Sequence, residues 1–128
     1  MPAGVYDFEV EQGATFKRSF LYSNKDTGVP YNITGCKIRM QVRKAQQQPV
    51  IIEATTENGK FTITDGSGGK FDMTLSAVDT AALTSKEALY DIEIEFPDGP
   101  PATVNRILKG AFKVDPSITQ IVSEPVLE

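Results

Sequence analysis

The residues best suited to chemistry in this chain are three carboxylates that alternate along one segment. Asp91, Glu93 and Glu95 are separated by apolar residues, a spacing that places all three on one face of a strand. Such an acidic row could bind a hard cation such as Ca²⁺, or supply the carboxylate pair of a glycosidase. Alternate positions diverge along a sheet instead of converging on one point. A solvated strand face therefore explains the acidic row better than a metal or catalytic site does.

A basic row, formed by Lys37, Arg39 and Arg43, alternates with apolar residues in the same way. It could bind phosphate or nucleic acid, but it lacks interleaved exposed aromatic residues and belongs to a chain of net charge -4. Another interpretation places the basic row opposite the acidic row on neighbouring strands. Each opposite-charge pair would then contribute up to about 1 kcal/mol and help to fix the register. The sequence leaves this pairing open as an alternative to two solvated faces.

Other motifs that suggest chemistry fail on inspection. The glycine-rich stretch before Lys70 resembles a phosphate loop, but Phe71 occupies the position that requires Ser or Thr. Cys36 is in phase with apolar residues, which favours a small core residue over a nucleophile. The chain contains no histidine, so the commonest general base and metal ligand is missing. The sequence predicts no catalytic, cofactor-binding or metal-binding residue, and a protein that is not an enzyme.

Composition predicts one globular domain with protein partners. The chain has 128 residues, of which 40% are hydrophobic and 23% charged, values ordinary for a domain that folds on its own core. A single cysteine excludes an internal disulfide. The net negative charge disfavours nucleic acid and membrane surfaces. The N-terminus has neither the basic start nor the apolar run of a signal peptide, so we expect synthesis and folding in a cytoplasm.

A period of two in the apolar residues dominates the chain and predicts half-buried strands. The short segment 76–83 departs from this period. Ser76 can cap a helix there and Asp79 favours its first turn, so one short helix is expected. The expected strands cover residues 6–10, 16–22, 36–43, 50–56, 60–64, 70–75, 89–96 and 103–114.

The spacing of these strands predicts a mainly β fold, a single immunoglobulin-like antiparallel β-sandwich with one short helix near residues 76–83. The sandwich is expected over residues 1–116, followed by a partly ordered C-terminal tail over 117–128. We expect the first two strands to pair with each other. Asn58-Gly59 predicts a hairpin between the strands that flank it, and Gly110 is interpreted as the mark of a bulge.

Six strings along the chain form one pattern, in which a strand, a turn and an alternating strand recur. The strings are Val5-Tyr-Asp-Phe-Glu-Val-Glu-Gln-Gly-Ala-Thr-Phe16, Ile33-Thr-Gly-Cys-Lys-Ile-Arg-Met-Gln-Val-Arg43, Gly69-Lys-Phe-Asp-Met-Thr-Leu-Ser-Ala77, Thr80-Ala-Ala-Leu83, Tyr90-Asp-Ile-Glu-Ile94 and Val104-Asn-Arg-Ile-Leu-Lys-Gly110. Over roughly residues 5 to 119, this pattern resembles small structural proteins of tailed bacteriophages. The resemblance lies with the β-sandwich modules that begin upper-baseplate proteins and those in collars that anchor fibres. Pro100-Pro101 departs from the pattern by lengthening a turn.

The resemblance implies a non-enzymatic virion protein of the tail, baseplate or collar, made in the host cytoplasm. Its implied partners are tail-tube, baseplate or fibre proteins and further copies of itself, with no nucleic acid or membrane. A capsid decoration or head–tail connector protein is the alternative of the same kind. A carbohydrate-binding module is the alternative of another kind, and would need an exposed aromatic platform. Apolar residues of the tail could pack on a neighbour: Ile118, Ile121, Val122, Val126 and Leu127.

Overall fold

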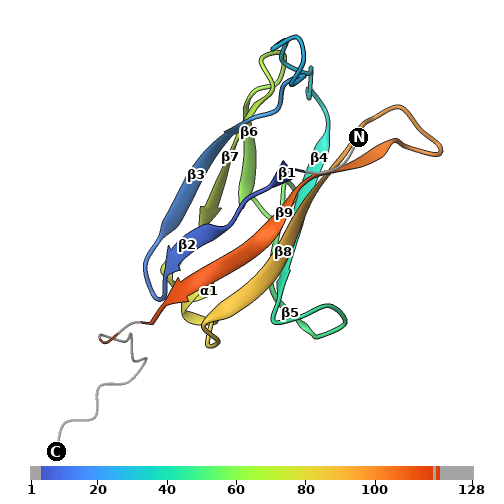
Figure 1. Ribbon diagram of the computed structural model, residues 1–128. Helices are drawn as coiled ribbons and strands as arrows, with labels where there is room; N and C mark the ends of the chain where they lie inside the picture. Colours follow the sequence, from blue (N-terminus) through green and yellow to red (C-terminus); the bar gives the residue numbers. More distant parts are fainter. Residues whose placement is uncertain (1–3, 117, 119–128) are drawn as a thin grey trace, which may run out of the picture.

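A computed structural model describes residues 4–116 and 118. These residues form two packed β-sheets with one short helix at the end of the sandwich where β9 stops (Figure 1). The elements are β1 (Gly4–Val5), β2 (Phe8–Glu11), β3 (Phe16–Leu21), β4 (Lys37–Arg43), β5 (Val50–Thr55), β6 (Phe61–Asp65), β7 (Lys70–Leu75), α1 (Ala77–Ala81), β8 (Glu87–Glu95) and β9 (Val104–Asp115).

The order of the strands is that of an immunoglobulin-like sandwich, which confirms the predicted fold class. The large sheet has the order β1-β9-β8-β4-β5, with β2 also on β9, and the small sheet has the order β3-β7-β6. One detail differs from the prediction, because β1 and β2 run parallel to β9. These first and last strands are not joined by a turn. Sequence periodicity therefore carried no information about the direction of their pairing.

The period of two places one face of each long strand in a common core. On β4, β7 and β8 the alternate side chains are buried, as expected for strands that each face the opposite sheet. Cys36 is buried with them, and burial together with the charge of Asp98 raises the pKa of its thiol. The interpretation of Cys36 as a core residue is confirmed.

Two predicted strand pairings are wrong. Strand β2 pairs with β9 and β3 pairs with β7, so the first two long strands lie in different sheets. The turn between them bridges the sandwich, since Gln12 N–H donates to the Asp115 carbonyl and Gly13 N–H to Thr80 Oγ1. Likewise β5 pairs with β4 and β6 with β7. Asn58-Gly59 therefore carries the chain from one sheet to the other and does not close a hairpin.

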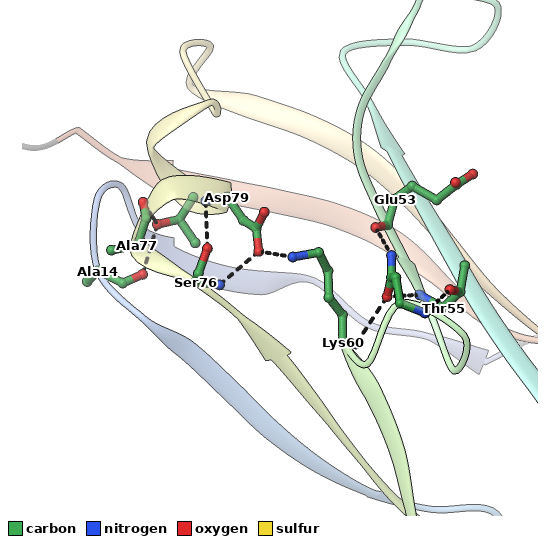
Figure 2. Close-up of polar contacts among 9 residues, drawn as sticks. Ala14, Glu53, Thr55, Lys60, Ser76, Ala77 and Asp79 are labelled. Carbon is green, nitrogen blue, oxygen red and sulfur yellow. Dashed lines mark hydrogen bonds and ion pairs between the residues drawn. The ribbon is translucent and has the colours of Figure 1, made fainter. Parts of the chain in front are cut away.

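Helix α1 begins where the sequence predicts and is held by polar contacts on two sides (Figure 2). Ser76 Oγ accepts from Asp79 N–H at 3.1 Å, and Asp79 Oδ2 accepts from Ser76 N–H at 2.9 Å, a reciprocal capping box. The same Asp79 oxygen binds Lys60 Nζ at 2.7 Å. Thr80 is fully buried and donates its hydroxyl to the Ala14 carbonyl. These contacts tie the β2–β3 and β5–β6 connections to the helix.

Replacing Asp79 by Asn should lower the free energy of unfolding at pH 7 by about 1–2 kcal/mol, because Lys60 loses its anionic partner. Burial by itself raises the pKa of Asp79, but the hydrogen bonds from Lys60 and Ser76 lower it by more. The pKa of Asp79 therefore lies below its ordinary value of 3.8. The stabilisation is therefore complete at neutral pH and is lost as the pH falls below 3.8 through the folded-state pKa. Urea unfolding at a series of pH values measures it.

The control for this prediction is Asp26→Asn, in an exposed loop, which should unfold like the wild type at every pH. A constant difference between wild type and Asp79→Asn down to pH 2 would contradict the assigned ion pair.

The predicted C-terminal tail, residues 117–128, lies outside the described residues apart from Ile118, which is fully exposed. In the described part of the chain, no helix has the length and apolar character that a membrane crossing requires.

Candidate protein-binding site

The acidic row and the basic row lie side by side on the outer face of the large sheet. Strand β4 pairs with β8 in a register that sets Arg39 opposite Glu93. Arg39 Nε lies 2.9 Å from Glu93 Oε1, and Arg39 Nη1 lies 3.2 Å from Glu95 Oε1. These bonds raise the pKa of Arg39. The alternative in which the two rows pair across neighbouring strands is confirmed for Arg39.

The remaining members of the rows have other partners. Asp91 Oδ2 lies 3.3 Å from Arg106 Nε on β9, so each carboxylate of the acidic row has an arginine beside it. Arg43 donates to the Gln48 carbonyl at 2.6 Å and to Gln41 Oε1 at 2.8 Å. Among the described residues, no group of three or more acidic, cysteine or histidine side chains is arranged to hold a metal ion.

A groove of about 600 Å³ crosses this outer face. Strands β4, β8 and β9 form its floor, the β1–β2 segment one wall, and the loop after β4 the other. The lining residues are Val5, Asp7, Gln41, Arg43, Ala45, Gln46, Gln47, Glu87, Leu89, Tyr90, Asp91, Arg106, Lys109, Gly110 and Ala111.

The groove combines apolar surface with a balanced set of charges. Val5 and Leu89 are exposed there, at 72% and 41% of their surface, beside two alanines. Three basic and three acidic side chains also line it. Within residues 4–116 and 118, no ion pair engages Arg43, Glu87 or Lys109. Apolar area mixed with polar and charged groups is usual at protein–protein interfaces.

The β1–β2 wall depends on a close backbone approach at Gly110. A Cβ atom at this position would overlap the carbonyl of Tyr6. The same carbonyl accepts the hydroxyl of Tyr90 at 2.6 Å, and Asp7 Oδ1 accepts from Ala111 N–H at 2.9 Å. Burial, with the nearby charge of Asp7, raises the pKa of Tyr90 far above its usual range. The Tyr90 hydroxyl therefore stays protonated as a donor to this wall.

The bulge predicted at Gly110 is wrong. Gly110 lies in register with Tyr90, and the shift in the β8–β9 ladder falls between Ile92 and Glu93. Glycine is required at position 110 because the backbone at Tyr6 passes close to it. Close approach of another backbone is, like a bulge, a common reason for a glycine inside a strand.

Several polar groups of the groove are engaged within the chain. Its lining contains no serine, threonine, cysteine or histidine, and its only hydroxyl, that of Tyr90, is engaged by the Tyr6 carbonyl. Asp7 is held by Ala111 N–H and lies 3.7 Å from Lys113 Nζ. The exposed side chains of Val5 and Leu89, with the charges of Glu87 and Lys109, are the groups available to a partner.

Sequence reasoning did not find this groove, because its walls come from segments far apart in the chain. One signal was present. Leu89 occupies an outward position in the alternation of β8, where the neighbouring outward residues Asp91 and Glu93 are charged. A single exposed apolar residue is ordinary on a protein surface, so Leu89 points to a binding surface only together with the groove that the fold builds around it.

Fold and groove together define a small immunoglobulin-like β-sandwich with a candidate protein-binding face. No protein-family model matches the chain, and no curated protein is significantly similar to it.

Proposed function

We propose that this chain is a non-enzymatic structural protein of a tailed-phage virion, located in the tail, baseplate or collar. It assembles there with other virion proteins and anchors side or tail fibres. The observation that carries its binding role is the groove on the large sheet. The resemblance to phage β-sandwich modules is the reason for proposing a location in a phage virion.

The strings that carry the resemblance support the fold more than the contact surface. Phe8 and Val10 from the first string, and Ile38 and Met40 from the second, are buried in the core. They are framework positions of the sandwich. The groove supplies what the strings leave open, a surface on which a partner can bind without any reactive group.

Modest affinity at each groove is enough for this role. In a symmetric ring, several copies engage a shared partner at once, and the effective concentration of the later contacts multiplies the affinity of the first. Exposed charges at the rim favour correct orientation and fast association.

The test of the proposal is the composition of the particle. Phage particles produced by the gene's own phage or induced prophage are purified, and an antibody against the chain is used for immunoblotting and gold labelling. We expect the chain in the particle in a fixed ratio to the tail proteins, with label on the tail. Label on the head would support the decoration or connector alternative instead. Absence of the chain from purified particles would reject a virion role.

Reversing one unpaired charge of the groove should weaken attachment of the partner. Lys109→Glu replaces an unpaired positive charge with a negative one on a rim that already holds unpaired Glu87, so co-purification with tail or fibre proteins should fall about tenfold or more. Lys25→Glu makes the same charge change in an exposed loop outside the groove and should bind like the wild type. Equal losses for both variants would show that net charge, and not the groove, sets the binding.

A further inference from the structure

The dipeptide Asn58-Gly59 can undergo a covalent reaction within its own backbone. The nitrogen of the residue after an asparagine can attack the carbon of the asparagine side-chain amide. Glycine permits this attack best, because it has no side chain to hinder the approach. Asn58 and Gly59 are both exposed, and a Cβ atom on Gly59 would meet no atom within 4 Å. Water and base from the solvent therefore have access to the dipeptide.

The reaction is deamidation, and its only co-reactants are water and solvent base. The Gly59 nitrogen forms a bond to Cγ of Asn58, and the bond from Cγ to Nδ2 breaks. The proton of the Gly59 nitrogen passes through solvent to Nδ2, which leaves as ammonia. Water then opens the cyclic imide at either carbonyl, which leaves aspartate or isoaspartate at position 58. The first step requires the amide carbon to face the attacking nitrogen at close range.

Four hydrogen bonds hold Asn58 and fix the orientation of its amide. Nδ2 donates to the Glu53 carbonyl at 2.9 Å, and Oδ1 accepts from Thr55 N–H at 3.0 Å (Figure 2 shows the contacts at Glu53 and Thr55). Oδ1 also accepts from Lys60 N–H at 3.1 Å, and Asn58 N–H donates to Thr55 Oγ1 at 2.9 Å. Both ends of the amide are engaged, so it cannot rotate without breaking some of these bonds.

The residues that hold the amide are fixed by the fold. Glu53 and Thr55 belong to β5, which pairs with β4. Lys60 Nζ lies 2.7 Å from Asp79 Oδ2 on α1, and the Lys60 carbonyl accepts from Thr74 N–H on β7 at 2.8 Å. The turn at Asn58 is therefore attached to both sheets and to the helix.

We propose that Asn58 is a deamidation site that the folded turn keeps closed and that reacts when the turn opens. The rate of reaction is then the rate in an open chain multiplied by the fraction of time that the turn is open. Aspartate at position 58 keeps an acceptor for Thr55 and Lys60 but lacks the donor to the Glu53 carbonyl. Isoaspartate also lengthens the backbone of the turn. Each product therefore loosens the turn from β5.

The test compares the deamidation of the full chain in native buffer and in guanidinium chloride, at the same alkaline pH. Peptide mapping by mass spectrometry gives the fraction of aspartate and isoaspartate at position 58 over time. We expect the rate to be about tenfold or more lower in the folded chain, because at least two hydrogen bonds must break first. Asn24, Asn32 and Asn105 precede residues with side chains and serve as internal controls. In guanidinium chloride they should react more slowly than Asn58.

Thr55→Val tests whether these particular bonds give the protection. It keeps a β-branched side chain and removes the acceptor of Asn58 N–H. The rate in native buffer should rise about threefold or more, the effect of losing one hydrogen bond, while the rate in guanidinium chloride stays unchanged. Thr55→Ser keeps the hydroxyl and should react as slowly as the wild type. Thr62→Val is the matched control, because Thr62 is exposed on β6 and takes part in none of the four bonds.

Two results would overturn the proposal. One is an equal rate at Asn58 in the folded and the unfolded wild type, which would show that the turn gives no protection. The other is a folded Thr55→Val protein that reacts no faster than the wild type. If Thr55→Val does not fold, by circular dichroism, Lys60→Met replaces it, since it removes the bond to Asp79 and keeps the Lys60 N–H. It should also raise the rate, and no rise rejects the proposal.

This site is distinct from the groove, because Asn58 and its hydrogen-bond partners are not among the groove's lining residues. The two assignments therefore fail independently. Lys109→Glu should deamidate at Asn58 at the rate of the wild type. A chain whose Asn58 is protected as expected but which is absent from phage particles would keep this inference and reject the proposed function.

Discussion

Replacing Phe8 by Ala should lower the free energy of unfolding by about 3–5 kcal/mol, the largest effect we expect from a single substitution in this protein. Phe8 is buried and its ring packs edge-on against Phe16 and Phe20 of β3, at centroid distances of 5.6 and 6.0 Å. It also contacts Tyr90 of β8 and Phe112 of β9. One side chain on the large sheet thus joins both sheets.

Truncation at Phe8 removes its own burial and leaves a cavity among rings that cannot collapse without moving a strand. Equilibrium unfolding in urea, followed by circular dichroism, measures the loss. Leu21→Ala is the control, because Leu21 ends β3 with 57% of its surface exposed. It should change stability by less than about 0.5 kcal/mol. A similar loss for both variants would contradict the central position of Phe8.

The second prediction concerns Gly110, where alanine should lower the free energy of unfolding by about 1–3 kcal/mol. The added Cβ overlaps the carbonyl of Tyr6, and this neighbour is backbone, which cannot rotate away as a flexible side chain would. Relief requires the β1–β2 segment to move off β9. That movement weakens the bond from the Tyr90 hydroxyl to Tyr6 and shifts the groove wall at Asp7.

Two measurements separate this effect from an ordinary loss of stability. Urea unfolding gives the free energy, and binding of the groove partner at a temperature where the variant is folded reports on the displaced wall. Gly4→Ala is the matched control, since a Cβ there would meet Leu108 Cδ1 at an ordinary 3.5 Å. We expect it to match the wild type in both measurements. A fully stable Gly110→Ala protein would show that glycine is not needed at this crossing.

Local signals in the sequence predicted the elements well. The alternation in 36–43 and 70–75 identified strands and their buried faces, because a period of two leaves little choice once one face must be apolar. Ser76 and Asp79 predicted the start of the helix, because capping depends on residues three positions apart. The interpretation of Cys36 as a core residue followed from its phase with the buried side chains.

Pairing across long distances was beyond those signals. The strands flanking Asn58-Gly59 looked like a hairpin, yet the Asn58 amide binds the edge of β5 and the chain passes to the other sheet. The parallel pairing of β2 with β9 joins residues about a hundred positions apart, as in Phe8 with Phe112. Periodicity reports which face of a strand is buried. It does not report which neighbour lies beside it.

The absence of histidine and the outward alternation of the charged rows were legible in the sequence from the start. What those rows do was decided in three dimensions, where Arg39 meets Glu93 and Glu95 across the β4–β8 ladder. The groove, and the hydrogen bonds from Asn58 to the edge of β5, also arise only in the folded chain. Each is built from groups that become neighbours only when the chain folds. The order of side chains along one strand therefore does not predict these contacts.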